Sequence, residues 1–248
     1  MLHITYYTDP LCCWSWAFEP QWRRFRFEYS ESIRVSYCMG GLLPEWNSFN
    51  DATNHVSRPI QMGPVWMHAA QISGMPMNTR IWMEDPPASS YPACIAVKCA
   101  TLQSGEAGEM YLRKLREQIM LGGRNISKQE ILNQVAELLY EQSSERFSLQ
   151  RFNEDIRNET GIDAFRLDMN QVRLHNINRF PTLIIRSPGS SAMMMTGYRD
   201  YAGLSSAISQ IAPRLEKTRD RYSVDEYVSY WGSITERELE EIKTGKAV

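Results

Sequence analysis

The sequence predicts an α/β protein in which a β-α-β segment and a β-β-α segment flank a long block of helices. Strand-like stretches occur only near residues 2–39 and 180–196, and helical periodicity dominates between them. The chain has 248 residues, of which 43% are hydrophobic, so it is long enough to bury a sizeable core. After residue 213 two capping sequences predict a small helical hairpin.

The N-terminal segment is expected to form a strand, a helix and a second strand. Residues 2–8 are rich in β-branched and aromatic side chains and stop at Asp9-Pro10, which suits a buried strand. From Cys12 to Tyr29 apolar residues recur every three or four positions, which predicts one amphipathic helix with the Cys12-Cys13 pair in its first turn. Residues 33–39 then alternate as a second strand.

The middle of the chain is expected to be entirely helical. Ser127 and Glu130 form a capping-box sequence before an apolar helix face. The methionines at positions 62, 67, 75, 77, 83 and 193–195 are expected to fill an irregular core. The expected helices span residues 89–103, 108–121, 127–139, 147–160 and 163–176.

The C-terminal part returns to strand character. Residues 180–186 and 192–196 are expected to form a β-hairpin around a turn at residues 187–191. Asp200 is a suitable N-cap for the helix that follows. The capping boxes Ser223–Glu226 and Thr235–Glu238 predict the helical hairpin of the tail.

This order of elements resembles the thioredoxin fold in its DsbA-like form. The residues that carry the likeness are Asp9-Pro-Leu-Cys-Cys-Trp-Ser-Trp16, Phe180-Pro-Thr182 and Gly197-Tyr-Arg199. The resemblance implies a discontinuous thioredoxin-like domain of residues 1–43 and 177–213, a helical insertion domain of residues 44–176, and a C-terminal helical tail of residues 214–248.

The insertion contains four further motifs: Asp85-Pro-Pro87, Ser90-Tyr-Pro-Ala93, Tyr111-Leu-Arg-Lys-Leu-Arg-Glu117 and Gly123-Arg-Asn-Ile-Ser127. On these motifs the chain is similar, within that superfamily, to the adaptor family that presents the transcription regulator Spx to the ClpXP protease. That family commonly carries a segment rich in His and containing Cys before the first strand, whereas this chain has only His3 there, so metal binding by that route is not expected.

Cys12 is the candidate nucleophile, because backbone N–H groups and the dipole at a helix start stabilise a thiolate. Redox-active relatives have Cys-x-x-Cys, but the residue three positions after Cys12 is Ser15, expected to hydrogen-bond the thiolate. A mixed disulfide on Cys12 would therefore need an external thiol for its resolution, with glutathione as the candidate co-substrate. No other cofactor is expected. Alternatively, Cys12 and Cys13 are both small buried side chains, and for Cys13 packing is favoured.

The resemblance implies that Pro181 is the cis-proline beside the active-site cysteine, with Phe180 and Thr182 flanking a substrate groove. The alternative is that Pro181 merely begins a strand. Trp14 and Trp16 are both candidates either to line that groove or to pack in the core, and Trp14 is the better surface candidate. Structural roles are expected for the four histidines and for Cys38, Cys94 and Cys99, and no metal site is predicted.

Two leading functions remain open from the sequence, beside a third, a glutathione-dependent isomerase or transferase, which the Ser at the active position of relatives on this fold suggests. The first is a thiol-disulfide oxidoreductase or isomerase with a monothiol Cys-x-x-Ser site, acting on mixed disulfides of proteins or glutathione. The alternative is a protease adaptor that binds a regulator without catalysis. A net charge of −2 argues against nucleic acid and anionic membranes as partners. The odd number of cysteines, five, and a start without a secretory signal favour the cytoplasm. The oligomeric state stays open.

Overall fold

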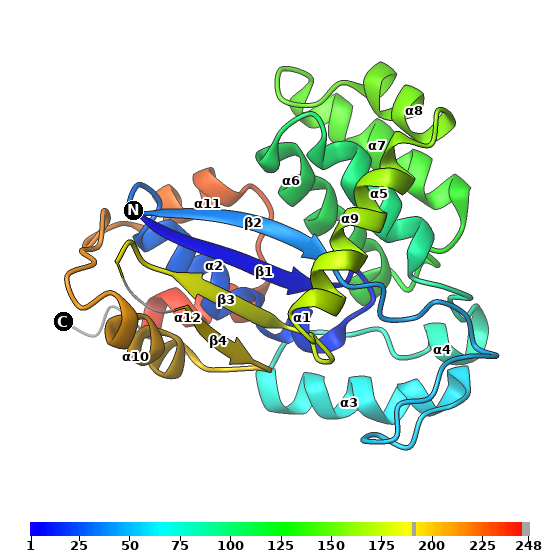
Figure 1. Cartoon of the computed structure of the whole chain (residues 1–248), viewed down its shortest axis with the longest axis horizontal. Helices are drawn as coiled ribbons and strands as arrows, with labels where there is room; N and C mark the ends of the chain where they lie inside the picture. The colour runs from blue at the N-terminus through cyan, green and yellow to red at the C-terminus, as the bar shows by residue number, and fades with distance from the viewer. Residues whose placement is uncertain (190–191, 245–248) are drawn as a thin grey trace.

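The computed structural model describes residues 1–189 and 192–244. Four strands form one sheet in the order β2-β1-β3-β4. β1 (Leu2–Thr8) and β2 (Ile33–Met39) are parallel, β3 (Thr182–Arg186) is antiparallel to β1, and β4 (Met193–Thr196) is antiparallel to β3. In Figure 1 the C-terminal ends of β1 and β2 point toward the helical block. The predicted α/β class and the β-hairpin are confirmed, although residues 190 and 191 of the expected turn lie outside the described residues.

The helices follow the predicted order. Two of them, α1 (Cys13–Ala17) and α2 (Glu19–Glu28), lie between β1 and β2. The insertion between β2 and β3 contributes α3 (Met62–Ser73), α4 (Ile81–Glu84), α5 (Tyr91–Thr101), α6 (Gly105–Arg116), α7 (Gln129–Ser143), α8 (Leu149–Arg157) and α9 (Thr160–Leu174). A 3-10 turn (Pro59–Gln61) precedes α3, and a π-helical segment (Glu117–Leu121) extends α6. After β4 come α10 (Tyr201–Ile211), α11 (Val224–Trp231) and α12 (Glu236–Thr244).

The helix predicted from Cys12 to Tyr29 is divided at Phe18, so the prediction of a single helix was wrong. Pro20 lies in the first turn of α2 and has no N–H with which to continue the hydrogen-bond ladder of α1. Cys12 is the N-cap of α1 and Cys13 its first residue.

Different helices cover the two faces of the sheet. On one face Ile4 and Leu183 share a cluster with Phe25 of α2 and Leu204 of α10. The other face lies against α9, whose Val172 belongs to a separate cluster with residues of β1, β2 and β3. The insertion has a larger core of its own, and this core also includes Leu11 of the β1–α1 connection and Cys13 and Trp16 of α1. The helical insertion therefore packs directly around the start of α1. The exact domain boundaries stay predictions.

The C-terminal hairpin packs on α2, as α12 and α2 lie in contact. Both predicted capping boxes are confirmed: Ser223 and Glu226 exchange hydrogen bonds at the start of α11, and Thr235 and Glu238 do so before α12. The Asp200 cap of α10 is also present. No helix in residues 1–189 or 192–244 combines the length and the apolarity that crossing a bilayer requires.

Two local predictions were wrong. The Ser127–Glu130 capping box does not form, because the Ser127 hydroxyl donates to Asn125 at 2.6 Å and α7 begins after Lys128. The Met-rich runs lie only partly in the core: Met62 and Met75 are buried, while the side chains of Met67, Met83 and Met194 are half-exposed or more. The exposed methionines occupy outward positions of α3, α4 and β4, which face solvent in the described structure.

Candidate functional site

Cys12 lies where the loop after β1 enters α1. Its Sγ accepts a hydrogen bond from the Ser15 backbone N–H at 3.3 Å and donates one to the Phe180 carbonyl at 3.5 Å. The cysteine is only 5% exposed. The first bond makes Cys12 the side-chain cap of α1, and the second joins it to the loop before β3.

The loop before β3 contains a cis peptide bond between Phe180 and Pro181, as the family resemblance implied. Thr182 starts the strand, is buried, and donates its hydroxyl proton to the Arg179 carbonyl at 2.8 Å. The Pro181 carbonyl accepts from the N–H of Gly197, which follows β4, at 2.7 Å. These bonds fix the loop from both sides and leave the Phe180 carbonyl directed at Cys12.

The two tryptophans of α1 have different environments. Trp14 is partly exposed, and its ring lies 5.6 Å from His68 of α3 and 6.2 Å from Tyr198. Trp16 is fully buried and donates its indole N–H to the Pro76 carbonyl at 3.0 Å. Trp14 therefore belongs to an aromatic rim beside the site, and Trp16 belongs to the core. His68 was expected to be structural, but its exposed side chain contributes to this rim.

Burial dominates the electrostatics of Cys12 and raises its pKa above the ordinary value of a thiol. The Ser15 side chain and backbone N–H act in the opposite direction, although Ser15 Oγ makes no hydrogen bond of ordinary geometry with the described residues. The Asp9 carboxylate raises the pKa of Cys12 further, and the Arg116 guanidinium lowers it. In this structure Cys12 is therefore a protonated thiol at neutral pH, and the helix start does not outweigh its desolvation.

Asp9 is a neighbour of the site to which the sequence analysis gave no role beyond ending a strand and beginning the motif of the family resemblance. Its fully buried carboxylate accepts from the N–H groups of Leu11 and Leu42, at 2.8 and 2.7 Å. It also accepts from the Ser90 hydroxyl at 2.8 Å and the Cys94 thiol at 3.3 Å. Asp9 thus ties the loop that carries Cys12 to the start of α5. In the sequence, the feature that could have indicated this role was an acidic residue within an apolar N-terminal stretch.

Arg116 of α6 is the second residue that the sequence analysis missed. It is 1% exposed, donates to the Thr8 hydroxyl, and pairs with Glu19 at 2.5 Å. Arg113, one turn earlier, also reaches Glu19, at 3.2 Å. A buried cation from the insertion therefore lies beneath the Cys12 site. The signal for it in the sequence was the motif Tyr111-Leu-Arg-Lys-Leu-Arg-Glu117, which was used only for the family resemblance.

The other cysteines lie in the core. All five cysteines are unpaired thiols, and burial raises the pKa of Cys13 well above its ordinary value. Cys38, Cys94 and Cys99 are also buried, as predicted. Across residues 1–189 and 192–244, no group of three or more His, Cys, Asp or Glu side chains has the arrangement of a metal site.

The chain is similar to curated adaptor proteins. It is 30% identical to the ClpXP adapter protein SpxH of Halalkalibacterium halodurans over 202 residues, which are 81% of this chain and 64% of that protein. SpxH of Bacillus subtilis is 27% identical over 184 residues, covering 73% of this chain and 57% of the relative. The chain thus spans less than two thirds of the length of these relatives.

The solved structures and the family comparison agree on the fold. A proposed protein disulfide isomerase from Nitrosomonas europaea superposes with a TM-score of 0.68 at 21% identity, covering 84% of this chain and 96% of that one. The cytosolic disulfide reductase DsbM of Pseudomonas aeruginosa has a TM-score of 0.58 at 19% identity, covering 78% and 88%. Residues 6–204 match the family described as Thioredoxin. The chain therefore belongs to the thioredoxin family and has the DsbA-like form of its fold.

Proposed function

We propose that the chain is a protein-binding adaptor that keeps a thioredoxin scaffold and presents a regulator of the Spx type to the ClpXP protease. The state of the candidate nucleophile carries this proposal: Cys12 is 5% exposed, and burial raises its pKa. A site that turns over disulfides needs an accessible thiolate and usually a second thiol, but Ser15 occupies that second position. The similarity to SpxH supports the adaptor function.

The surface beside Cys12 suits protein binding. Trp14, His68 and Tyr198 form the partly exposed aromatic rim, and the half-buried Phe180 bonds the thiol through its carbonyl. Aromatic side chains supply large contact areas at protein interfaces at a low cost in conformational entropy. The five unpaired thiols support a reducing compartment, and we place this activity in the cytoplasm.

A monothiol enzyme is the second candidate. The Cys12–Phe180 contact at 3.5 Å favours it, because this contact places the sulfur beside a backbone segment that an extended substrate could pair with. In that reaction the Cys12 thiolate attacks a protein–glutathione disulfide and the protein thiolate leaves. A second glutathione thiolate then attacks the Cys12–glutathione disulfide, releases oxidised glutathione and restores Cys12.

An assay with purified components distinguishes the adaptor from the enzyme. We would measure the affinity of the chain for Spx of Halalkalibacterium halodurans and the rate at which ClpXP degrades Spx with and without the chain. Wild type and Cys12→Ser are expected to bind Spx equally and to accelerate its degradation equally, with no deglutathionylation turnover in either. Loss of both effects in Cys12→Ser, together with turnover by the wild type, would reject the adaptor in favour of the enzyme.

A further inference from the structure

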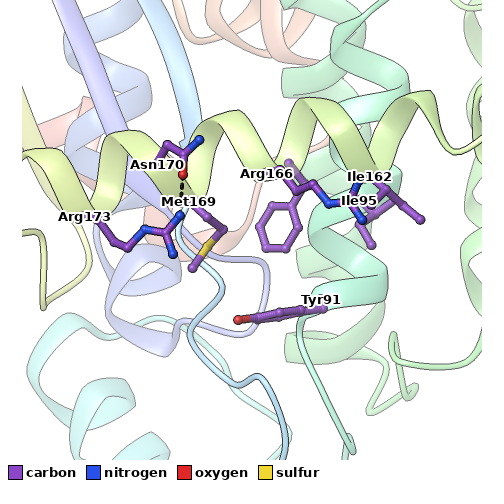
Figure 2. Close-up of a pocket in the computed structure, with 8 residues that line it drawn as sticks. Tyr91, Ile95, Ile162, Arg166, Met169, Asn170 and Arg173 are labelled. Carbon is purple, nitrogen blue, oxygen red and sulfur yellow. Dashed lines mark hydrogen bonds between the residues drawn. The ribbon is translucent and has the colours of Figure 1, made fainter.

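A groove lies between α5 and α9, on the insertion side of the Cys12 site. Its volume is about 460 Å³, within the range of ligand sites in proteins. Tyr91 and Ile95 come from α5, and Phe165 and Met169 come from α9, with the Tyr91 and Phe165 rings edge to face at 5.0 Å. Figure 2 shows Tyr91 of α5 and Met169 of α9 facing the space between the two helices. The floor of the groove is therefore apolar.

The rim of the groove carries positive charge. Arg166 and Arg173 are both exposed and line it on α9, seven residues apart. That spacing is two helical turns, or about 10 Å, so both guanidinium groups lie on the same side of α9. Arg166 pairs with the exposed Asp163 at 2.8 Å, and such a surface pair is easily exchanged for another partner. Arg173 donates to the neutral amide of Asn170.

Exposed leucines repeat with the same period as the arginines. Leu167 is 66% exposed and Leu174 is 73% exposed, and each directly follows one of the two rim arginines. This part of α9 thus presents two Arg-Leu pairs to solvent, two turns apart. Neither leucine lines the groove, but both add exposed apolar surface to α9 next to its two rim arginines.

The turn after β2 packs against both the groove walls and the loop beside Cys12. A Cβ atom at Gly41 would lie 2.8 Å from Met169 Sδ and 2.9 Å from the Tyr91 ring, so two side chains of the groove lie directly against this glycine. The preceding residue, Gly40, is covered in the same way by the Phe180 ring. The groove and the loop that accepts the Cys12 hydrogen bond are therefore neighbours across two consecutive residues.

We propose that this groove binds an amphipathic helix of the partner protein, with two carboxylates seven residues apart and apolar residues between them. The inference rests on the adaptor function and names the chemistry of its partner. The spacing favours a helix: about 10 Å corresponds to three residues of a strand, whose side chains would point to opposite faces, but to two full turns of a helix. The apolar residues would fill the groove over Phe165 and Ile95.

A designed peptide tests the groove directly. The probe is a fluorescent 18-residue helix with Glu at positions i and i+7 and Leu at i+3 and i+4, and its affinity is measured by anisotropy. The double variant Arg166→Glu/Arg173→Glu is expected to bind it at least tenfold more weakly than wild type. Arg214→Glu changes an exposed arginine away from the groove and should leave the affinity unchanged. A peptide with Lys in place of both Glu residues should prefer the double variant.

Equal binding of the Glu peptide by wild type and the double variant would overturn the inference. So would equal binding of a scrambled peptide of the same composition. A second measurement, the binding of Spx by the chain, distinguishes failure of the groove inference from failure of the proposed adaptor function. If wild type and the double variant capture Spx equally, the adaptor stands and the groove inference is rejected. If wild type captures no Spx but binds the peptide with the predicted charge dependence, the adaptor is rejected and the groove stands.

Discussion

The Cys12 thiol and the Phe180 carbonyl are joined by a hydrogen bond of 3.5 Å, although 168 positions separate the two residues in the chain. The bond holds the loop before β3 against the sulfur. With Cys12 5% exposed, the thioredoxin site of this chain is covered by its own loop. This arrangement leads to the predictions below.

Cys12 should react slowly with a small alkylating reagent at neutral pH. Burial raises its pKa, so the reactive thiolate is less populated at pH 7 than in a free thiol. The alkylation rate of the native chain, corrected with Cys12→Ser, should lie below that of the urea-unfolded chain at every pH near neutrality. A rate that reaches its plateau below pH 7 would show a depressed pKa and contradict this prediction.

Ser15→Cys should restore a dithiol. Residues three apart on a helix are neighbours, and the Ser15 N–H already lies 3.3 Å from Cys12 Sγ. We expect the variant to form an internal disulfide on mild oxidation and to gain insulin-reduction activity that wild type lacks. Ser15→Ala is the matched control and should show neither property. Equal activity in wild type and Ser15→Cys would mean that the missing second thiol is not what limits turnover.

Gly40→Ala should loosen the loop that covers Cys12. A Cβ atom at this position would lie 2.0 Å from the tip of the Phe180 ring, which must then move. The expected loss is about 1–3 kcal/mol in the free energy of unfolding, as for other overpacked sites. Faster alkylation of Cys12 should accompany it.

Gly63→Ala is the control, because a Cβ there meets no atom within 4 Å. In helix α3 it should change stability by less than about 1 kcal/mol, in the stabilising direction. Urea unfolding of both variants measures the difference. A Gly40→Ala protein as stable as Gly63→Ala would show that the Phe180 ring does not constrain this glycine.

Glu238 should make the fold sensitive to acid. The ion pairs with Arg23 at 2.6 Å and Arg113 at 2.8 Å outweigh desolvation and lower its pKa from 4.5 to about 2. Because the folded-state pKa is the lower one, the stabilisation is complete above about pH 4.5 and is lost as the pH falls toward 2. The shift corresponds to about 3 kcal/mol.

Glu238→Gln should therefore unfold at lower urea concentration at pH 6 and lack this part of the acid dependence. The exposed Glu240→Gln is the control and should resemble wild type. Urea midpoints at pH 6, 4 and 3 provide the comparison. If wild type and Glu238→Gln lose stability in parallel between pH 4 and 3, another group is responsible.

The sequence predicted the strands and most helices because these depend on local patterns, whereas the cis-proline loop was implied by the family resemblance. Alternating and helical periodicities and the capping residues act over a few positions, and Phe180-Pro181 was identified by resemblance. The break at Phe18 followed from Pro20, a signal that was present but outweighed by the periodicity.

The environment of Cys12 could not be predicted, because it depends on residues distant in sequence. Asp9 accepts from Ser90 and Cys94, and Arg116 reaches Thr8 across 108 positions. The helix start predicted a stabilised thiolate, whereas tertiary burial reversed the direction of the pKa shift.

The central claim is that partner binding, and not Cys12 chemistry, is what this scaffold does. The most direct measurement is the dissociation constant of Spx from wild type and from Cys12→Ser, under reducing conditions in which no disulfide can form. The account predicts the same dissociation constant within a factor of two. A tenfold or greater loss of affinity in Cys12→Ser would contradict it.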